Sequence, residues 1–335
     1  MSLQTTLPKA LRPSTRRRFL PSTRYAPVIV TLLLLVAIYA AGAGRYRGFQ
    51  SGQVFVNLFI DNAFLIVLAV GMTFVILTGG IDLSVGSVVA LSTMIAASLA
   101  RDGWPPAAIV LVVLLVGSGL GLLVGLVIHY FQIQPFIVTL AAMFLARGLC
   151  YVISLRSISI TEPWFTWMAQ TRIPLLPKLS ITPSVIVAVL VVAIAFFVLH
   201  YTRTGRTVYA IGGGGQSAVL MGLPVTRTKV LVYVISGFCS GLAGILFTFY
   251  TLSGYSLTAV GMELDAIAAV VIGGTLLTGG SGFVLGSLLG VLLLGIIQTI
   301  ISFEGTLSSW WTRIVIGGLL LAFILLQRLL TARKR

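Results

Sequence analysis

Apolar stretches of membrane-spanning length recur along the whole sequence, and no other feature constrains the fold as strongly. A run of about 20 apolar residues is long enough to cross the hydrocarbon core of a bilayer as a helix. Candidate spans cover residues 25–44, 55–78, 85–100, 107–128, 136–154, 184–200, 230–250, 267–277, 283–301 and 310–327, of which 267–277 is the shortest.

The composition supports a membrane location. Hydrophobic residues make up 58% of the chain and charged residues 9%, whereas soluble domains carry about a quarter charged residues. The chain therefore has too little polar surface to coat a water-soluble globule. We expect an all-α, polytopic bundle of about ten transmembrane segments, with a membrane domain over 25–330 and basic tails at 1–24 and 331–335.

The formal net charge of +15 lies mainly in connecting segments and tails. This placement indicates membrane orientation rather than nucleic-acid binding. With the N-terminus in the cytoplasm, fourteen Lys and Arg residues fall inside and six outside. The positive-inside rule then predicts that both termini are cytoplasmic.

No metal or disulfide site is expected. Cys150 and Cys239 both lie inside apolar segments without metal-ligand spacing, so packing is the simpler role for them. His129 and His200 fall at predicted helix ends with no ligand partner at suitable spacing.

Glycine is abundant, with 36 residues. Small residues let helix backbones approach each other closely in lipid. We assign this packing role to two sets of regularly spaced glycines: Gly117, Gly121 and Gly125, and Gly286 and Gly290.

Two glycine motifs recur at equal spacing. The sequence Leu-Thr-Gly-Gly at 77–80 is followed by Gly-Ser at 86–87, and the same residues stand at 277–280 and 286–287. The match indicates an internal repeat, in parallel rather than inverted relation because both motifs fall on the cytoplasmic side. Chance similarity in a glycine-rich chain is the alternative. We interpret four of these glycines as turn residues: Gly79, Gly80, Gly279 and Gly280.

Ionisable residues inside membrane segments are costly and are functional candidates. Asp61 (next to Asn62), Asp82 and Arg147 are such residues. For Asp82 we favour a cap at the start of the following helix, where a carboxylate accepts backbone N–H bonds. Arg147 would either pair with Asp61 or Asp82, or bind hydroxyl groups of a substrate.

The long cytoplasmic segment 201–229 contains four glycines at 212–215, followed by a stretch that can form a short helix. A helix with apolar residues outside the membrane suits docking of a cytosolic partner; a plain amphipathic connector is the alternative. Because no Gly-Lys-Ser/Thr follows the glycines, a phosphate-binding loop is excluded and ATP would be used by another subunit. The expected docking residues are Gln216, Ser217, Val219, Leu220, Met221 and Gly222.

Four stretches together resemble the ribose-type permeases of carbohydrate ABC importers. They are VGMTFVILTGGIDLSVGSVVA (70–90), QPFIVTLAAMFLARG (134–148), the loop 205–222, and ELDAIAAVVIGGTLLTGGSGFVLGSLLG (263–290). Residues 61–65 and 303–311 look most like the permeases of the galactofuranose importer. One position departs from the family, which commonly has Asn where this chain has Gly214.

The resemblance implies a transport subunit of the bacterial inner membrane that performs no covalent chemistry. Its implied partners are a second permease in a heterodimer, an ATPase with two fused nucleotide-binding domains that uses ATP and Mg²⁺, and a periplasmic sugar-binding protein. That protein would dock on 156–183 and 253–265. No cofactor is expected in this chain.

The cargo would be a monosaccharide, with galactofuranose or a related furanose or pentose as the best match. Sugar sites combine hydrogen-bonding groups with apolar or aromatic surfaces, and the candidates are Asp61, Asn62, Arg147 and Glu263. A secondary transporter, with Asp61 or Asp82 coupled to a proton or cation, is the main alternative. An intramembrane enzyme would need a convergent catalytic set, and the sequence contains none.

Overall fold

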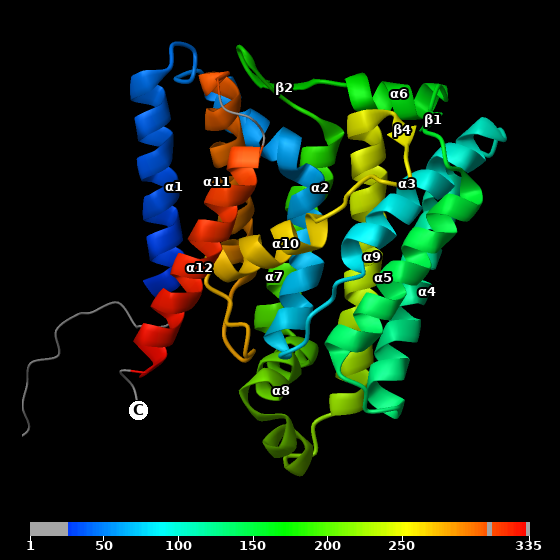
Figure 1. Cartoon of the computed structure of the whole chain (residues 1–335), viewed down its shortest axis with the longest axis vertical. Coiled ribbons are helices and arrows are strands. Elements are labelled where there is room, and N and C mark those ends of the chain that lie inside the picture. The colour runs from blue at the N-terminus through cyan, green and yellow to red at the C-terminus, as the bar shows by residue number, and fades with distance from the viewer. Residues whose placement is uncertain (1–25, 307–309, 333–335) are drawn as a thin grey trace, which may run out of the picture.

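The computed structural model describes residues 26–306 and 310–332, so the basic tail 1–24 and residues 333–335 lie outside the described part. The chain is helical almost throughout (Figure 1). Its helices are α1 (Ala26–Arg45), α2 (Gly52–Leu77), α3 (Val85–Arg101), α4 (Pro106–Tyr130), α5 (Pro135–Ile153), α6 (Pro163–Gln170), α7 (Pro183–Tyr201), α8 (Arg203–Leu220), α9 (Val225–Thr251), α10 (Met262–Ile272), α11 (Val284–Glu304) and α12 (Trp310–Ala332).

The all-α, polytopic prediction is confirmed. Within the described residues, seven helices are long and apolar enough to cross a membrane: α1, α2, α4, α5, α7, α9 and α11. Helix α3 and the Trp310–Leu325 part of α12 are shorter apolar helices. The total of about ten segments, and the side on which each terminus lies, remain predictions.

Helix α10 does not cross a bilayer by itself, so the predicted span at 267–277 is wrong. Its 11 residues give a length of about 16 Å at 1.5 Å per residue, against a hydrocarbon core of about 30 Å. The helix ends at Ile272 because Gly273 and Gly274 follow, and Gly274 has a left-handed φ of 95°. The Thr31 hydroxyl of α1 donates to the Ile272 carbonyl at 2.5 Å and caps this buried end.

Non-helical backbone interrupts the chain at two related places. Helix α2 stops at Leu77, and α3 does not begin until Val85. In the second place α10 stops at Ile272, and α11 begins at Val284. Irregular backbone at membrane depth is tolerated where protein surrounds it, and Figure 1 shows both connections inside the bundle toward the end where α8 lies.

Glycines bring α4 and α9 into close contact, as predicted from their spacing. A methyl group on Gly117 would lie 2.5 Å from the Gly237 carbonyl oxygen, and one on Gly125 would lie 3.0 Å from the Val230 Cα. Gly286 and Gly290 of α11 likewise lie against the backbone of Gly273 and of α10. A side chain at these positions would clash with the facing backbone. In lipid the hydrophobic effect does not bring helices together, so their association depends on close packing of this kind.

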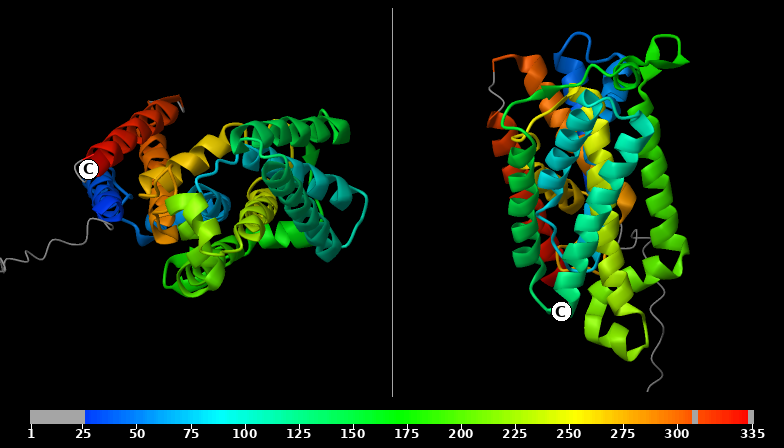
Figure 2. Two further views of the ribbon diagram at one scale, coloured as in Figure 1. Left: turned by 90° about the horizontal axis from the view of Figure 1, so that it is seen from below. Right: turned by 90° about the vertical axis from the view of Figure 1, so that its right-hand side faces the viewer.

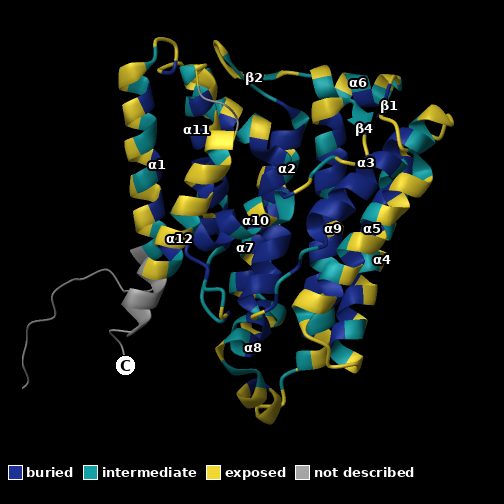
Figure 3. Cartoon of the chain, in the orientation of Figure 1, coloured by how far each residue is buried: buried dark blue, intermediate teal, exposed yellow. Residues whose placement is uncertain are grey.

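Burial separates the inner helices from the outer ones. In Figure 3 the middle of the molecule, around α2, α3 and α9, is mostly buried, whereas α1, α4, α5 and α12 carry many exposed residues. Leu33, Leu115, Phe144 and Leu321 are each at least 60% exposed. Exposed leucine and phenylalanine on these helices fit a surface that faces lipid acyl chains.

Short strands and α6 cover the end of the bundle opposite α8 (Figures 1 and 2). The strands are β1 (Ile158–Ser159), β2 (Ile173–Leu176), β3 (Leu179–Ile181) and β4 (Ser253–Gly254). β1 pairs antiparallel with β4, and β2 with β3. The β1–β4 pair joins the connection before α6 to the one after α9.

Candidate functional site

A cavity of about 500 Å³ opens among α2, α10 and α11. We call it the outer cavity; it is lined by Val54, Asn57, Asp61, Asn62, Phe64, Leu65, Tyr250, Met262, Asp265, Gly295, Gln298, Thr299, Ser302 and Phe303. Carboxylates, amides and hydroxyls are thus combined with three aromatic rings. A mixture of this kind suits a small polar ligand with an apolar face.

Two of the four predicted sugar-binding residues lie in the outer cavity. Asp61 and Asn62 stand next to each other on α2. The Asn62 amide is 5% exposed, donates to the Leu58 carbonyl at 2.9 Å and packs against Gly295 of α11. Asp61 is exposed and also lines a smaller cavity of about 180 Å³, where Arg172 stands near its carboxylate. Asp61 is therefore the more accessible of the two.

Arg147 lies away from the outer cavity. Its Nη1 donates to the backbone carbonyls of Ser256 and Thr258, at 2.6 and 2.8 Å. Within the described residues it forms no ion pair with Asp61 or Asp82, so the predicted pairing is not found. Arg147 instead ties α5 to the connection that leads into α10.

Glu263 is also outside the outer cavity. It stands in the first turn of α10, where a carboxylate complements the positive end of the helix dipole. Its Oε2 is buried against Gly86 of α3 and has no hydrogen-bond partner among the described residues.

Asp265, Gln298, Thr299 and Ser302 line the outer cavity but were not predicted as site residues. The polar residues of α11 stand at positions i, i+1 and i+4, on one face of an otherwise apolar helix. That stripe is visible in the sequence. The sequence does not show that Asp265 lines the cavity, because α10 was predicted to begin later than it does.

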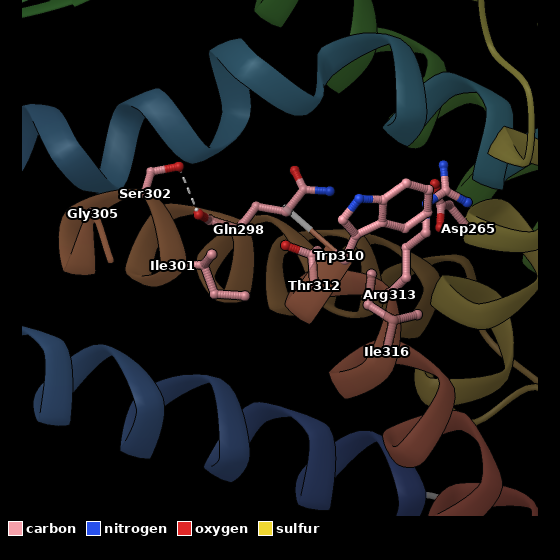
Figure 4. A pocket seen from close by; sticks show the side chains of 9 residues that line it. All are labelled: Asp265, Gln298, Ile301, Ser302, Gly305, Trp310, Thr312, Arg313 and Ile316. Carbon is pink, nitrogen blue, oxygen red and sulfur yellow. Dashed lines mark hydrogen bonds between the residues drawn. The ribbon is translucent and has the colours of Figure 1, made fainter. Parts of the chain in front are cut away.

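A second cavity, of about 610 Å³, lies between α10, α11 and α12 (Figure 4). We call it the α12 cavity; it is lined by Asp265, Gln298, Ile301, Ser302, Gly305, Trp310, Thr312, Arg313 and Ile316. It shares Asp265, Gln298 and Ser302 with the outer cavity. The two hollows are therefore neighbours separated by the polar face of α11.

The two repeated glycine turns meet each other and α8. The Gly280 N–H donates to the Leu77 carbonyl at 2.9 Å. A methyl group on Gly279 would lie 2.7 Å from the Gly79 nitrogen and 3.0 Å from the Gly212 Cα. We call this contact of Gly79, Gly212, Gly279 and Gly280 the glycine junction.

Backbone conformation explains why glycine stands at the two turns. Gly79 and Gly279 have φ angles of 80° and 83°, in the left-handed region that glycine occupies without a steric penalty. The turns lie together at one end of the bundle, as a parallel repeat requires. The duplication itself remains a prediction.

Asp82 is buried and holds the first interrupted segment in place. Its Oδ1 accepts from the Ser84 backbone N–H at 3.0 Å and from the Ser84 hydroxyl at 2.6 Å. Its Oδ2 accepts from the Ser236 hydroxyl of α9 at 2.7 Å. The carboxylate thus bonds to Ser84, the residue that precedes α3, and joins that segment to α9. It accepts no N–H from the first turn of α3, where the described residues show no side-chain cap, so the expected cap is not found.

Helix α8 projects beyond the rest of the bundle (Figure 1). Its backbone breaks from helical geometry at Gly214, and the last turn follows the break. Val219, Leu220 and Met221 are 59, 88 and 66% exposed, while Ala218 is buried. Three adjacent exposed apolar side chains outside the span-forming part of the chain mark an interaction surface.

Comparison with known proteins gives the relationship of this chain. A family model described as "Branched-chain amino acid transport system / permease component" matches residues 54–324. The chain belongs to this permease family. No solved structure matches it significantly.

The relatives of this chain include an inner-membrane ABC permease and permeases named for sugar import. The "Inner membrane ABC transporter permease protein YjfF" of Escherichia coli is 48% identical over 92% of this chain and 93% of its own length. The "Fructose import permease protein FruG" of Bifidobacterium longum is 45% identical (94% and 93% covered), and the "Ribose import permease protein RbsC" of E. coli is 36% identical (89% and 92% covered). The expected ribose-type family is confirmed. The chain is a multi-pass protein of the inner membrane.

Proposed function

We propose that this permease is the membrane-spanning subunit of an ATP-driven importer that carries a monosaccharide. Its relatives include permeases named for import of ribose and fructose and for transport of D-allose. The structural observation that carries the proposal is the exposed apolar tip of α8, connected through the glycine junction to both interrupted segments. A cytosolic partner that binds this tip and moves it would also move the interrupted segments, because the glycine junction connects them to α8.

The cytosolic partner is an ATPase with two fused nucleotide-binding domains, which binds ATP and Mg²⁺. It docks on residues 216–222 at the tip of α8. Gly212, two residues before the break at Gly214, touches the backbone of Leu77 and of Gly280. Movement of α8 therefore shifts the 78–84 and 273–283 connections together, because the backbones are in direct contact with no side chain between them.

The sugar-binding protein docks at the opposite end. The β1–β4 pairing joins the segments 156–183 and 253–265 into one surface. Arg147 fixes this surface to α5 through the carbonyls of Ser256 and Thr258. The docking protein thus presses on the connection that leads directly into α10.

The sugar passes through the outer cavity, where Asp61 and Asn62 offer polar contacts beside Phe64 and Tyr250. A second, homologous permease completes the path in a heterodimer. Transport follows from a change in the relative stability of outward-open and inward-open states on ATP binding and hydrolysis. The permease itself makes and breaks no covalent bond.

The test is uptake of radiolabelled sugar into proteoliposomes that hold this chain with its co-encoded permease, ATPase and binding protein. Uptake that requires ATP and every subunit supports the importer. Uptake without the ATPase, driven by a proton gradient, would show a secondary transporter and overturn the proposal.

The same assay, with unlabelled sugars as competitors, shows which sugar the importer prefers. We infer galactofuranose, or a related furanose or pentose, because residues 61–65 and 303–311 resemble permeases of the galactofuranose importer; residues 307–309 of the second stretch lie outside the described part. Galactofuranose should compete more strongly than ribose or arabinofuranose. The reverse order would change the cargo and leave the importer proposal intact.

A further inference from the structure

Three side chains of the α12 cavity are left without hydrogen-bond partners among the described residues. They are Asp265 of α10, Gln298 of α11 and Arg313 of α12. A carboxylate accepts, a guanidinium donates and an amide does both. Gln298 and Arg313 are exposed and Asp265 is half-buried, so this set is accessible to a polar ligand.

Local structure brings the three groups to one cavity. Gly261 precedes α10 with a φ of 85°, and Arg313 Nη1 lies 2.9 Å from where a Gly261 side chain would begin. The absence of that side chain lets the guanidinium approach the first turn of α10, where it acts electrostatically on the Asp265 carboxylate. Arg313 and Asp265 thus line the same cavity, and among the described residues they are not joined in an ion pair.

An aromatic ring completes the lining. Trp310 is 71% exposed, and Figure 4 shows its indole at the same end of the cavity as Asp265 and Arg313. The Ser302 hydroxyl lies toward the other end and donates to the Gln298 carbonyl at 3.0 Å. The Gln298 carboxamide is left free by this bond.

The chemistry of this set matches an uncharged polyhydroxyl compound. Hydroxyl groups of a sugar both donate and accept, so they satisfy Asp265, Gln298 and Arg313 together. The C–H face of a sugar ring packs on an aromatic face such as that of Trp310. A phosphate group would meet the Asp265 carboxylate as well as Arg313 and is disfavoured by repulsion from the former. The volume, about 610 Å³, is that of a small-molecule site.

We propose that the α12 cavity is a monosaccharide-binding subsite of the transport path, with Trp310 as its stacking platform and Asp265, Gln298 and Arg313 as its polar contacts. It rests on the proposed import function. Because Asp265, Gln298 and Ser302 also line the outer cavity, a sugar moves between the two by exchanging partners along one face of α11.

The experiment compares Trp310→Ala with Trp311→Ala in the fully reconstituted importer. Trp311 is the matched control, since it is adjacent and 47% exposed but does not line the cavity. Uptake of radiolabelled galactofuranose, ribose and fructose is measured at saturating loaded binding protein, together with ATP hydrolysis. Loss of stacking should lower the uptake rate of Trp310→Ala about fivefold or more, while Trp311→Ala and Trp310→Phe stay within about twofold of the original chain.

Gln298→Leu gives a second test that does not depend on the aromatic residue. It should also slow uptake, without loss of ATP hydrolysis or of assembly with the partners. Wild-type uptake rates for both Trp310→Ala and Gln298→Leu would overturn the subsite while leaving the importer standing. A defect of Trp310→Ala that appears only in vesicles with phosphatidylglycerol, and is absent in phosphatidylcholine alone, would identify a lipid headgroup site and also overturn it. Wild-type uptake that does not need ATP would instead defeat the proposed function.

Discussion

Asp82 shows how one buried carboxylate organises a break between helices. At 3% exposure it receives hydrogen bonds from the Ser84 backbone, the Ser84 hydroxyl and the Ser236 hydroxyl. A buried polar group costs free energy unless it is paired. Here the pairing joins a non-helical connection to α9, a helix that is distant in sequence.

Asp82→Ala should destabilise the protein by about 1 to 3 kcal/mol, because buried donors on Ser84 and Ser236 lose their acceptor. Asp82→Asn should cost less, since its amide oxygen still accepts from Ser84. The measurement is thermal unfolding in detergent, with Asp102→Ala as the control because Asp102 is exposed at a helix end. Equal effects of Asp82→Ala and Asp102→Ala would contradict the role assigned to Asp82.

At the scale of elements, the interruptions after α2 and α10 are linked through backbone rather than side chains. The Leu77 carbonyl accepts from the Gly280 N–H at 2.9 Å, and Gly212 of α8 lies against both. Backbone contacts of this closeness leave little freedom for the elements to move separately. The glycine junction therefore behaves as one mechanical unit with α8.

Gly212→Ala and Gly213→Ala should differ sharply although the two residues are adjacent. A methyl group on Gly212 collides with the Leu77 carbonyl oxygen and the Gly280 nitrogen, whereas one on Gly213 meets nothing within 4 Å. Overpacking of this kind costs about 1 to 3 kcal/mol. We expect lower thermal stability and reduced ATP-driven uptake for Gly212→Ala alone, and similar values for both variants would show that α8 does not press on the junction.

Met221→Glu should uncouple transport, since Met221 belongs to the exposed apolar tip of α8 and a charge there opposes apolar docking. The expected result is loss of ATPase association on co-purification and loss of uptake, with normal insertion in the membrane. Met221→Leu keeps the apolar character and serves as the control. Unchanged association and uptake in Met221→Glu would count against the tip as the docking element.

The whole molecule has two unlike ends. One carries α6 and the short strands, and the other carries α8 with its exposed apolar turn (Figure 1). The interrupted segments and α10 lie between them, together with the outer cavity and the α12 cavity. The proposed importer needs two unlike ends, because it places the ATPase at one end and the sugar-binding protein at the other.

Labelling of single cysteines should show which end faces outward. Cys150 and Cys239 are buried, so the background from native thiols is low. We expect a membrane-impermeant maleimide to label Arg172→Cys in intact spheroplasts and to label Gln216→Cys only after permeabilisation. The opposite pattern would reverse the predicted orientation.

Much of the fold follows from local pattern. Each predicted membrane segment overlaps a helix in the structure, and the spacing of Gly117, Gly121 and Gly125 predicts close helix packing, which the structure shows to be against α9. The segment 267–277 failed as a span because hydropathy measures how apolar a stretch is, and a short helix enclosed by other helices is as apolar as one that faces lipid. The position where α10 ends depends on Gly274 and on the cap from Thr31.

The candidate site, like the fold, was predicted only in part. Asp61 and Asn62 stand out in the sequence as polar residues in an apolar segment, and they lie in the outer cavity. Arg147 stands out for the same reason but bonds to backbone carbonyls 109 and 111 residues away. The partner of a buried ionisable group comes from segments that are distant in sequence. The residues next to that group along the chain therefore do not identify its partner.

The membrane location, the family and most of the long helices can be read along the chain, because each depends on composition, periodicity or short motifs. The meeting of the two glycine turns with α8, and the convergence of Asp265, Gln298 and Arg313 on one cavity, become visible only in the folded chain. These contacts join elements that are distant in sequence, the end of α2 to the connection after α10, and α10 to α12. Their geometry arises from packing of whole helices rather than from any local preference.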